Sequence, residues 1–283
     1  MNVHRHTPTL SVMDPRTLAI RGVGYRRHPD KLDIESLITR QVFNAVGRLR
    51  EAWDPRLWRA APKPNLCTVY GLNGQPLLTD SVDAGWQLSL QDQAGLPRSF
   101  WDARRSQRHT DYDDQQRPIA VREHSAGEQP RVVERLTYGE SDPAFAAHNQ
   151  CGKLIRHDDP AGTQFVAGYG LAGTVLAENR CFLVDLETPD WPSELEARDA
   201  LLEDQSFVTC HAFNPAGGLR RQTDAMGNDR TFRYDLAGSL SEAWLLQAGD
   251  GKTRQRLVSD IGYNAYGQSE SEIAGNRVVS RAD

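Results

Sequence analysis

Glycines recur at a fixed spacing along this 283-residue chain and constrain its fold more than any other feature of the sequence. Within each of three groups the glycines follow one another at steps of ten and eleven positions, so one full unit has a period of twenty-one. The groups are Gly74, Gly85 and Gly95; Gly152, Gly162 and Gly173; and Gly217, Gly227 and Gly238. Single copies occur at Gly47 and Gly267, while Gln116 occupies the position one full period after Gly95. Such self-similarity indicates a repeat architecture.

An aromatic residue precedes the glycine position by four residues in seven of these units. The aromatics are Phe43, Tyr70, Tyr112, Tyr169, Phe213, Tyr234 and Tyr263. After a short turn, each step leaves about six or seven residues for a strand, which is the usual strand length. Glycine adopts positive φ in a hairpin turn without steric cost, and the Asp, Asn and Pro residues upstream favour turns. We therefore predict an all-β fold of antiparallel hairpins, in which each aromatic ends one strand and packs over the next hairpin.

The rest of the chain fits around the repeats, and we expect a single domain over 1–283. Its expected parts are leading strands (1–42), repeats (43–190), a helical insertion (191–207) and further repeats with a truncated end (208–283). Within the insertion we expect one short helix near 194–204, because Ser193 and Glu196 have the spacing of a capping box. The stretch "LLQAGDGKTRQRL" (245–257) predicts a longer hairpin with "GDG" at its tip.

The composition is that of a globular protein, with 39% hydrophobic and 25% charged residues. No apolar stretch reaches the roughly 18–20 residues that cross a bilayer, and the first residues lack the apolar segment of a signal peptide. The net charge of −5 argues against a nucleic-acid partner, which favours a basic face. The cysteines are far apart without a CxxC pair, so we expect reduced and buried thiols rather than a zinc site or disulfides. They are Cys67, Cys151, Cys181 and Cys210.

Two pairs of adjacent carboxylates are candidates for acid–base chemistry. They are Asp158 and Asp159, within "HDDPAG" (157–162), and Asp113 and Asp114. Two carboxylates can share a proton when they face one another, but neighbouring side chains on a strand point to opposite faces. No third group is placed in the sequence to orient either pair. We therefore interpret both pairs as parts of turns and strands.

The remaining motif-like stretches carry less information about chemistry. Cys210 and His211 are adjacent and diverge on a strand, so a catalytic Cys–His pair would need a histidine from elsewhere. "DAMGNDR" (224–230) places oxygen ligands around a glycine but lacks the distal glutamate of a calcium loop. "GYGLAG" (168–173) matches GxGxxG in letters, yet it lies on the repeat spacing rather than in a βαβ unit. We predict no catalytic, cofactor-binding or metal-binding residues.

The repeat resembles the YD repeat, also called the RHS repeat, and Tyr234, Asp235, Gly238 and Leu240 match its pattern. Five longer stretches, in the family's order, are similar to the N-terminal part of the C component of bacterial insecticidal toxin complexes, the Tc toxins. They are "TPTLSVMDPRTLAIRGVGY" (7–25), "SVDAGWQLSLQD" (81–92), "CGKLIRHDDPAG" (151–162), "LVDLETPDW" (183–191) and "TDAMGNDRTFRYDLAGSL" (223–240). The chain therefore resembles the TccC-like members of the YD/RHS-repeat family.

This resemblance implies a fold and a role. In the family, the B and C components roll YD repeats into a β-spiral, a hollow shell that encloses the toxic segment of C. By resemblance, this chain is expected to be a non-enzymatic segment of such a shell, without a cofactor. It is expected to pair with a B-type subunit and with a downstream C-component segment that carries the toxin cargo. The resemblance further implies a protein that is cytoplasmic before assembly and then secreted in a toxin complex, without inserting into a membrane itself.

The sequence departs from the family's pattern at its end. It contains neither the family's self-cleavage region nor a toxin, and Ala282 stands where the repeat register places a tyrosine. We expect a truncated gene product, a split gene product or a deliberate fragment, and the sequence leaves these origins open. Two other functions also stay open: a module that binds sugars or receptors through tryptophans such as Trp86 and Trp101, and an inactive remnant.

Overall fold

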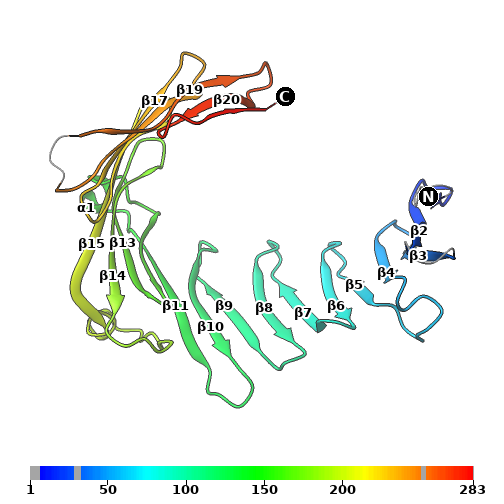
Figure 1. Ribbon diagram of the computed structural model, residues 1–283. Coiled ribbons are helices and arrows are strands. Elements are labelled where there is room, and N and C mark those ends of the chain that lie inside the picture. Colours follow the sequence, from blue (N-terminus) through cyan, green and yellow to red (C-terminus); the bar gives the residue numbers. More distant parts are fainter. Residues whose placement is uncertain (1–6, 29–32, 250–252, 283) are drawn as a thin grey trace. The chain divides into compact units, whose positions relative to one another are not determined.

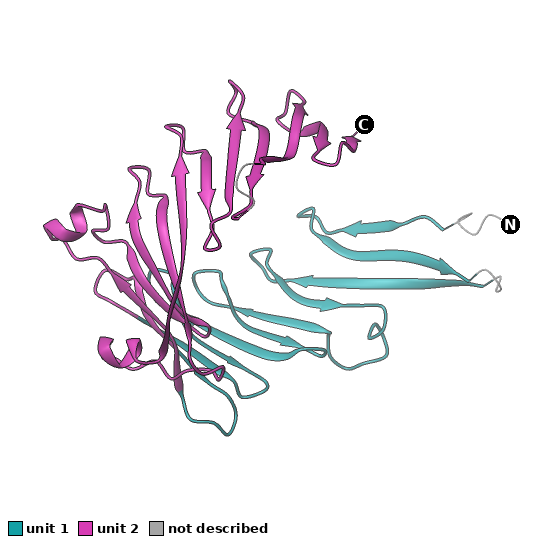
Figure 2. Ribbon diagram, turned by 60° about the vertical axis from the view of Figure 1, so that its left-hand side comes forward, with its two compact units in different colours: residues 1–111, 122–130 teal, residues 112–121, 131–283 magenta. Residues whose placement is uncertain are grey.

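The computed structural model describes residues 7–28, 33–249 and 253–282. Nearly all of its regular structure is antiparallel β-strand, and most strands pair with the next strand along the chain (Figure 1). The prediction of an all-β fold built from hairpins is thus confirmed. The chain divides into two compact units, unit 1 over 1–111 and 122–130 and unit 2 over 112–121 and 131–283 (Figure 2).

Unit 1 is a series of hairpins in a single layer of sheet, in which each strand pairs antiparallel with its neighbour along the chain. Its strands are β1 (Leu10–Met13), β2 (Ala19–Arg27), β3 (Ile34–Phe43), β4 (Leu49–Trp53), β5 (Leu66–Tyr70), β6 (Pro76–Ser81), β7 (Gly85–Gln91), β8 (Pro97–Asp102) and most of β9 (Gln107–Tyr112). Strand β10 (Pro118–His124) is divided between the two units. No described side chain of unit 1 is buried, because one layer of sheet leaves both faces open.

Unit 2 repeats the hairpin pattern and adds two short helices, α1 (Pro143–Ala146) after β11 and α2 (Leu195–Asp199) after β14. Its strands are β11 (Arg131–Tyr138), β12 (Leu154–Asp159), β13 (Gly162–Tyr169), β14 (Val175–Leu183), β15 (Leu202–Phe213), β16 (Leu219–Thr223), β17 (Asp229–Tyr234), β18 (Leu240–Leu246), β19 (Gln255–Tyr263), β20 (Ser269–Ala274) and β21 (Val279–Arg281). The buried apolar side chains among the described residues all belong to this unit: Ala120, Val121, Val133, Val166, Tyr169, Leu183, Trp191 and Ala243. The hydrophobic core is therefore small.

Many of the hairpin turns share one five-residue geometry. In the turn that starts at Asp92, the N–H of Gly95 donates to the Asp92 carbonyl (3.1 Å), and Asp92 Oδ1 accepts the N–H groups of Ala94 (2.8 Å) and Leu96 (2.9 Å). The fourth residue of such a turn has positive φ, as at Gly95 with +83°. Equivalent side-chain acceptors are Asp14, Asn44, Asp102, Asp113, Asp224 and Asn264. The short polar side chain that starts the turn thus satisfies the N–H groups that the hairpin ladder leaves unpaired.

The glycines on the repeat spacing all have positive φ, from +70° at Gly152 to +139° at Gly162. They are Gly47, Gly74, Gly85, Gly95, Gly152, Gly162, Gly173, Gly217, Gly227, Gly238 and Gly267. Two of them begin strands rather than sit within turns, Gly85 in β7 and Gly162 in β13. Gln116, which occupies a glycine position, also has positive φ (+61°). The backbone therefore keeps the left-handed conformation there although a side chain makes it costly.

Acid is expected to destabilise the hairpins through their turn carboxylates. The N–H of Arg117, helped by its guanidinium, holds the pKa of Asp113 below its usual value, and the Asn228 side chain does the same for Asp224. A carboxyl group with a lowered folded-state pKa stabilises the protein above its unfolded pKa of about 3.9 and loses this contribution as pH falls through the folded value. The unfolding temperature should therefore hold near neutral pH and fall below pH of about 4.

The matched control for this prediction replaces both carboxylates, as Asp113→Asn with Asp224→Asn. Asparagine keeps the Oδ1 acceptor, and Asn44 and Asn264 already fill this role in their own turns. The acid limb of the unfolding temperature, followed by circular dichroism, should be shallower in the double variant than in the parent chain. Identical limbs would show that other groups cause the acid sensitivity.

The helical insertion differs from the sequence-based prediction. Helix α2 ends at Asp199 instead of 204, because β15 begins at Leu202 and pairs with Leu183 of β14. Its N-cap is Glu194, whose side chain makes no capping hydrogen bond, so the prediction of a Ser193–Glu196 capping box is wrong. Helix α1 was not predicted at all. Its N-cap is Asp142, whose side chain accepts the N–H groups of Ala144 and Phe145, and Pro143 begins its first turn.

Two further expectations concern the cysteines and the hairpin over 245–257. Cys151 and Cys210 are exposed and Cys67 and Cys181 are partly exposed, so the prediction of buried thiols is wrong. A single layer of sheet provides little interior to bury them. All four are free of disulfides.

The hairpin over 245–257 is present as β18 paired with β19, and part of its "GDG" tip lies outside the described residues.

Candidate functional site

The repeat tyrosines tie successive hairpins together through their hydroxyl groups. The Tyr234 hydroxyl donates to the carbonyl of Leu219 (2.9 Å), which lies two residues after the turn glycine Gly217 of the preceding hairpin. The same contact joins Tyr70 to Leu49, Tyr169 to Leu154 and Tyr263 to Leu240. We call these contacts tyrosine clasps. Phe43 and Phe213 stand at repeat positions but lack the hydroxyl that a clasp requires.

One clasp was missed at the sequence level. Tyr138 donates to the carbonyl of Pro118 (3.0 Å), and its backbone pairs with Leu154 at a register shift, as Tyr169 pairs with Val175. Residues 139–152, including α1, take the place of the usual turn, so Tyr138 is separated from Gly152 by the whole of this segment instead of by a short turn. The signal that could have found it is the Leu-Thr-Tyr-Gly ending of a strand just before the interruption.

A cation lies over the ring of three clasp tyrosines. Arg117 Cζ is 4.3 Å from the Tyr138 ring centroid, and Lys153 Nζ is 4.6 Å from that of Tyr169. Arg48 lies over Tyr70 at 5.8 Å. Each cation directly follows a residue of positive φ at a repeat position, namely Gly47, Gln116 or Gly152, so the repeat supplies both the carbonyl and the cation. The rings are partly buried, and burial raises the pKa of Tyr138 and of Tyr169. The Tyr138 and Tyr169 hydroxyls therefore stay protonated donors at neutral pH.

Removing one clasp hydroxyl should destabilise unit 2 measurably. We expect Tyr234→Phe to lower the free energy of unfolding by about 1 kcal/mol, because the ring packing remains while the Leu219 carbonyl loses its donor. Tyr266→Phe is the control, since its side chain points from a turn tip and Tyr266 is 90% exposed. Urea denaturation of both variants measures the difference. Equal midpoints for the two variants would contradict a stabilising clasp.

Unit 2 contains a buried ion cluster that joins β12, β13 and α2. The carboxylate of Asp158, which is 0% exposed, accepts hydrogen bonds from Arg156 Nε (2.7 Å), Arg198 Nη1 (2.6 Å) and the Thr163 hydroxyl (2.6 Å). Arg156 also pairs with Asp199 of α2. Buried charges persist only when they are paired and hydrogen-bonded, so this cluster fixes α2 on the sheet.

Asp159 points away from this cluster, as expected for adjacent residues on a strand. Its carboxylate pairs with Arg180, and its carbonyl accepts the Trp191 indole N–H (3.2 Å). Burial pushes the pKa of Asp159 upward, but the Arg180 guanidinium and the Ala161 N–H outweigh it and hold the pKa below its usual value. The two carboxylates of "HDDPAG" thus have separate arginine partners and face different groups, an arrangement unsuited to sharing a proton.

Two of the other sequence candidates, Asp113 and Asp224, also have structural partners. Asp113 pairs with Arg117, four residues along the chain. In "DAMGNDR", Asp224 accepts the N–H groups of Met226 and Asn228, so its oxygens bind the turn itself. Cys210 is exposed on β15. Within the described ranges, no group of three or more His, Cys, Asp or Glu side chains is arranged to hold a metal ion.

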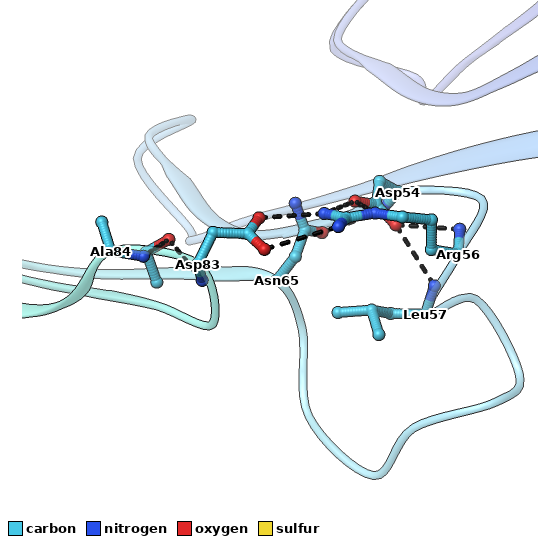
Figure 3. A network of polar contacts seen from close by, with 7 residues as sticks. Asp54, Arg56, Leu57, Asn65, Asp83 and Ala84 are labelled. Atoms are coloured by element: carbon cyan, nitrogen blue, oxygen red, sulfur yellow. Dashed lines mark hydrogen bonds and ion pairs between the residues drawn. The ribbon is translucent and has the colours of Figure 1, made fainter.

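A loop of unit 1, residues 54–65, is anchored to the sheet by a polar network (Figure 3). Asp54 Oδ1 accepts the N–H of Arg56 (2.9 Å), and the N–H of Asp54 donates to Asn65 Oδ1 (2.7 Å). The Arg56 guanidinium bridges the carboxylates of Asp54 (2.6 Å) and Asp83 (2.9 Å). The hydrogen bond from Arg56 is the main reason why the pKa of Asp54 lies below its usual value. Both ends of the loop are therefore held in place.

This loop carries Trp58, which lies among three arginines. The Cζ atoms of Arg21, Arg40 and Arg59 are 5.6, 5.4 and 5.9 Å from the Trp58 ring centroid. Trp53 meets Trp58 edge-on at 6.3 Å. We call Trp58 and its three arginines the Trp58 cluster. Cation–π attraction stabilises each of these contacts.

The tryptophans proposed for sugar stacking lie in varied surroundings. Trp86 is 41% exposed, whereas Trp101 meets His109 edge-on at 5.4 Å. Trp244 has the Arg256 guanidinium over its ring at 4.7 Å. Trp86 is thus the tryptophan of this set with the most open environment, and sugar binding stays an untested prediction.

Comparison with known proteins connects the chain to toxin subunits. No family model matches it. It is 34% identical over 290 residues to toxin subunit YenC1 of Yersinia entomophaga and 31% identical over 295 residues to YenC2, with 98% and 97% of the chain covered. A crystal structure of TcdB2-TccC3-Cdc42 covers 99% of the chain with a TM-score of 0.85 and 34% identity. The chain is homologous to Tc toxin C components over nearly its whole length.

The similarity to Tc toxins extends to an assembled toxin. The Photorhabdus luminescens Tc holotoxin pore, with a mutated TccC3, matches 99% of the chain at a TM-score of 0.86 and 33% identity. The chain thus has the RHS-repeat fold of a toxin-complex shell component. It spans 29% and 30% of the length of YenC1 and YenC2 and 14% and 13% of the matched chains in the two structures. Among the described residues of this Tc-toxin homologue, neither helix has the length and apolar character needed to cross a membrane.

Proposed function

We propose that this chain forms a non-enzymatic wall segment of an RHS-repeat shell and pairs there with a B-type subunit. The observation that carries the proposal is the match of 99% of the chain to TcdB2-TccC3 at a TM-score of 0.85. The hydrogen bonds of the polar side chains support it. Turn carboxylates accept backbone N–H groups, and the clasp tyrosines donate to backbone carbonyls, so few of these groups are left for catalysis. In the assembled complex, which is secreted, a downstream C-component segment would supply the cargo.

The repeat positions have a structural role in this proposal. Turn glycines set the bends, and the clasp tyrosines tie their hairpins to the preceding ones. Stacked repeats bury their surface against neighbouring repeats rather than in a central core, which agrees with the small core of unit 2. We also propose that the segment 1–283 works as a single repeat domain within the shell.

Co-purification tests the proposed pairing. The chain is co-expressed with a B-type Tc subunit that carries an affinity tag, and the complex is analysed by size-exclusion chromatography. We expect a stoichiometric complex, and the double variant Cys210→Ser, His211→Ala should assemble as well as the parent chain, because neither residue has a chemical task. A chain that stays monomeric and does not bind the B-type subunit would contradict the pairing.

A further inference from the structure

Unit 1 contains a locally basic region in an acidic protein. Residues 7–61 carry 10 Lys and Arg residues against 6 Asp and Glu residues, whereas the whole chain has a net charge of −5. Several of these arginines are neutralised locally, such as Arg16 by Asp14 and Arg56 by Asp54 and Asp83. The excess positive charge is therefore concentrated on the arginines without such partners.

The arginines of the Trp58 cluster are among those that lack a carboxylate partner. In the part of the chain that the structure describes, Arg21, Arg40 and Arg59 form no ion pair with a carboxylate. Arg21 on β2 stands directly opposite Arg40 on β3. Like charges at directly opposed positions destabilise a sheet. Stacking on Trp58 offsets part of this repulsion and leaves the charge in place.

The backbone conformation of Arg59, the third arginine of the cluster, is also unfavourable. Arg59 has φ +67°, a left-handed conformation that disfavours a side chain. The polar network around Asp54 and Arg56 anchors the loop that carries it (Figure 3). Repulsion and backbone strain at one cluster indicate a function, because stability alone would favour their removal.

A groove of about 580 Å³ lies beside the cluster and provides a concave surface on which a ligand can bind. Arg21 and Arg40 form part of its wall, together with apolar side chains. The apolar members are Val12, Ile20, Val42 and Phe43. Cationic and apolar groups thus line the same groove.

We propose that this groove binds an acidic polypeptide segment, whose carboxylates pair with Arg21 and Arg40 and whose apolar side chains contact the groove wall. Arg59 lies over the same Trp58 ring outside the groove lining and adds positive charge nearby. A guanidinium group can donate two parallel hydrogen bonds to one carboxylate, and stacking on Trp58 orients the guanidinium groups before a ligand binds. A nucleic acid fits less well, because it requires an extended basic surface and the chain as a whole is acidic. The proposal concerns the isolated chain and does not rest on shell assembly.

Fluorescence anisotropy with the full chain tests this proposal. The probe is a short, fluorescein-labelled peptide of alternating Glu and Val, and a Gln/Val peptide of the same length is the control. We expect saturable binding of the Glu peptide that weakens with salt, and at least about tenfold weaker binding of the Gln peptide. Absence of saturable binding, or equal binding of both peptides, would overturn the proposal.

Variants locate the binding site. The double variant Arg21→Gln, Arg40→Gln should bind the Glu peptide about tenfold more weakly. Arg50→Gln, which removes an exposed arginine of β4 outside the cluster, should bind as the parent chain does. The double variant should also keep or raise its unfolding temperature, because an opposed like-charge pair is removed. Equal peptide affinity in the parent chain and the double variant would overturn the assignment.

A competition experiment separates peptide recognition from simple anion binding. Inorganic phosphate is added to the peptide complex and compared with sodium chloride at the same ionic strength. We expect phosphate to displace the peptide no better than chloride, because the apolar wall contributes only to peptide binding. Displacement by phosphate at far lower ionic strength would identify a phosphate site and overturn the peptide proposal.

Discussion

Replacing Asp158 with asparagine is expected to lower the free energy of unfolding of unit 2 by about 3–5 kcal/mol. Asp158 has no exposed surface, and Arg198 is nearly as buried. Arg198 has no other ion-pair partner within the described residues, so the substitution leaves a buried guanidinium without a counter-charge. Such a change costs far more than the original pair contributes, because burial of an uncompensated charge is unfavourable. Urea denaturation followed by tryptophan fluorescence measures the loss, since Trp191 lies buried in the same unit.

The control for this prediction is Asp199→Asn. Asp199 pairs with Arg156 in the same cluster, but its side chain is 53% exposed. Water can replace an exposed partner, so we expect a loss of about 0–1 kcal/mol. The contrast between the two variants separates burial of charge from removal of an ion pair. A loss below about 1 kcal/mol for Asp158→Asn would show that the cluster does not fix α2.

The hairpin fold could be predicted because its cause is local. A glycine or its substitute at positive φ, together with a short polar side chain at the start of the turn or an aromatic four residues earlier, defines many of the turns within five or six residues. The antiparallel pairing of the strands that flank such turns follows from this local geometry. Where residues 139–152 replace a turn, the spacing fails, and both α1 and the Tyr138 clasp were missed.

The ion clusters could not be predicted, because their partners are distant in the sequence. Arg198 reaches Asp158 across 40 residues, and Arg21 of β2 meets Trp58 in the loop that follows β4. Neither contact leaves a periodic signal. The exposure of Cys210 was missed for a different reason, since average burial frequencies assume an interior that one layer of sheet does not provide. Sequence spacing thus predicts the hairpins. The ion clusters and the exposure of individual side chains depend on tertiary structure, which the spacing does not reveal.

A single layer of sheet must be stabilised differently from a globular core. In unit 2, Trp191, Tyr169 and a few aliphatic side chains are buried, and the rest of the apolar surface is half exposed. The tyrosine clasps tie neighbouring hairpins together, and the Asp158 cluster fixes α2 to β12 and β13. These contacts suit the proposed role in a wall, because each clasp secures a hairpin to its neighbour.

Gly162→Ala is expected to be far more damaging than the same substitution at Gly173. Gly162 has φ +139°, and a Cβ atom there would overlap the carbonyl oxygen of Cys181 on the paired strand β14 and lie 2.8 Å from the Cα of Phe182. Backbone atoms on a neighbouring strand cannot move aside without breaking the ladder. Left-handed strain and forced separation together should lower the free energy of unfolding by about 3–5 kcal/mol.

Gly173→Ala is the matched control, because Gly173 is the next glycine on the same repeat spacing. Its φ is +80°, and an added Cβ would meet only the end of the Lys153 side chain at 3.7 Å. The cost there is the left-handed conformation alone, about 1–2 kcal/mol. The two glycines occupy neighbouring positions of the same repeat spacing. The difference between the two losses of unfolding free energy, measured by urea denaturation, therefore reports the effect of the close approach of β13 and β14 at Gly162. Equal losses would mean that the glycines of the repeat serve only to set positive φ, and that the strands at Gly162 can separate to admit a side chain.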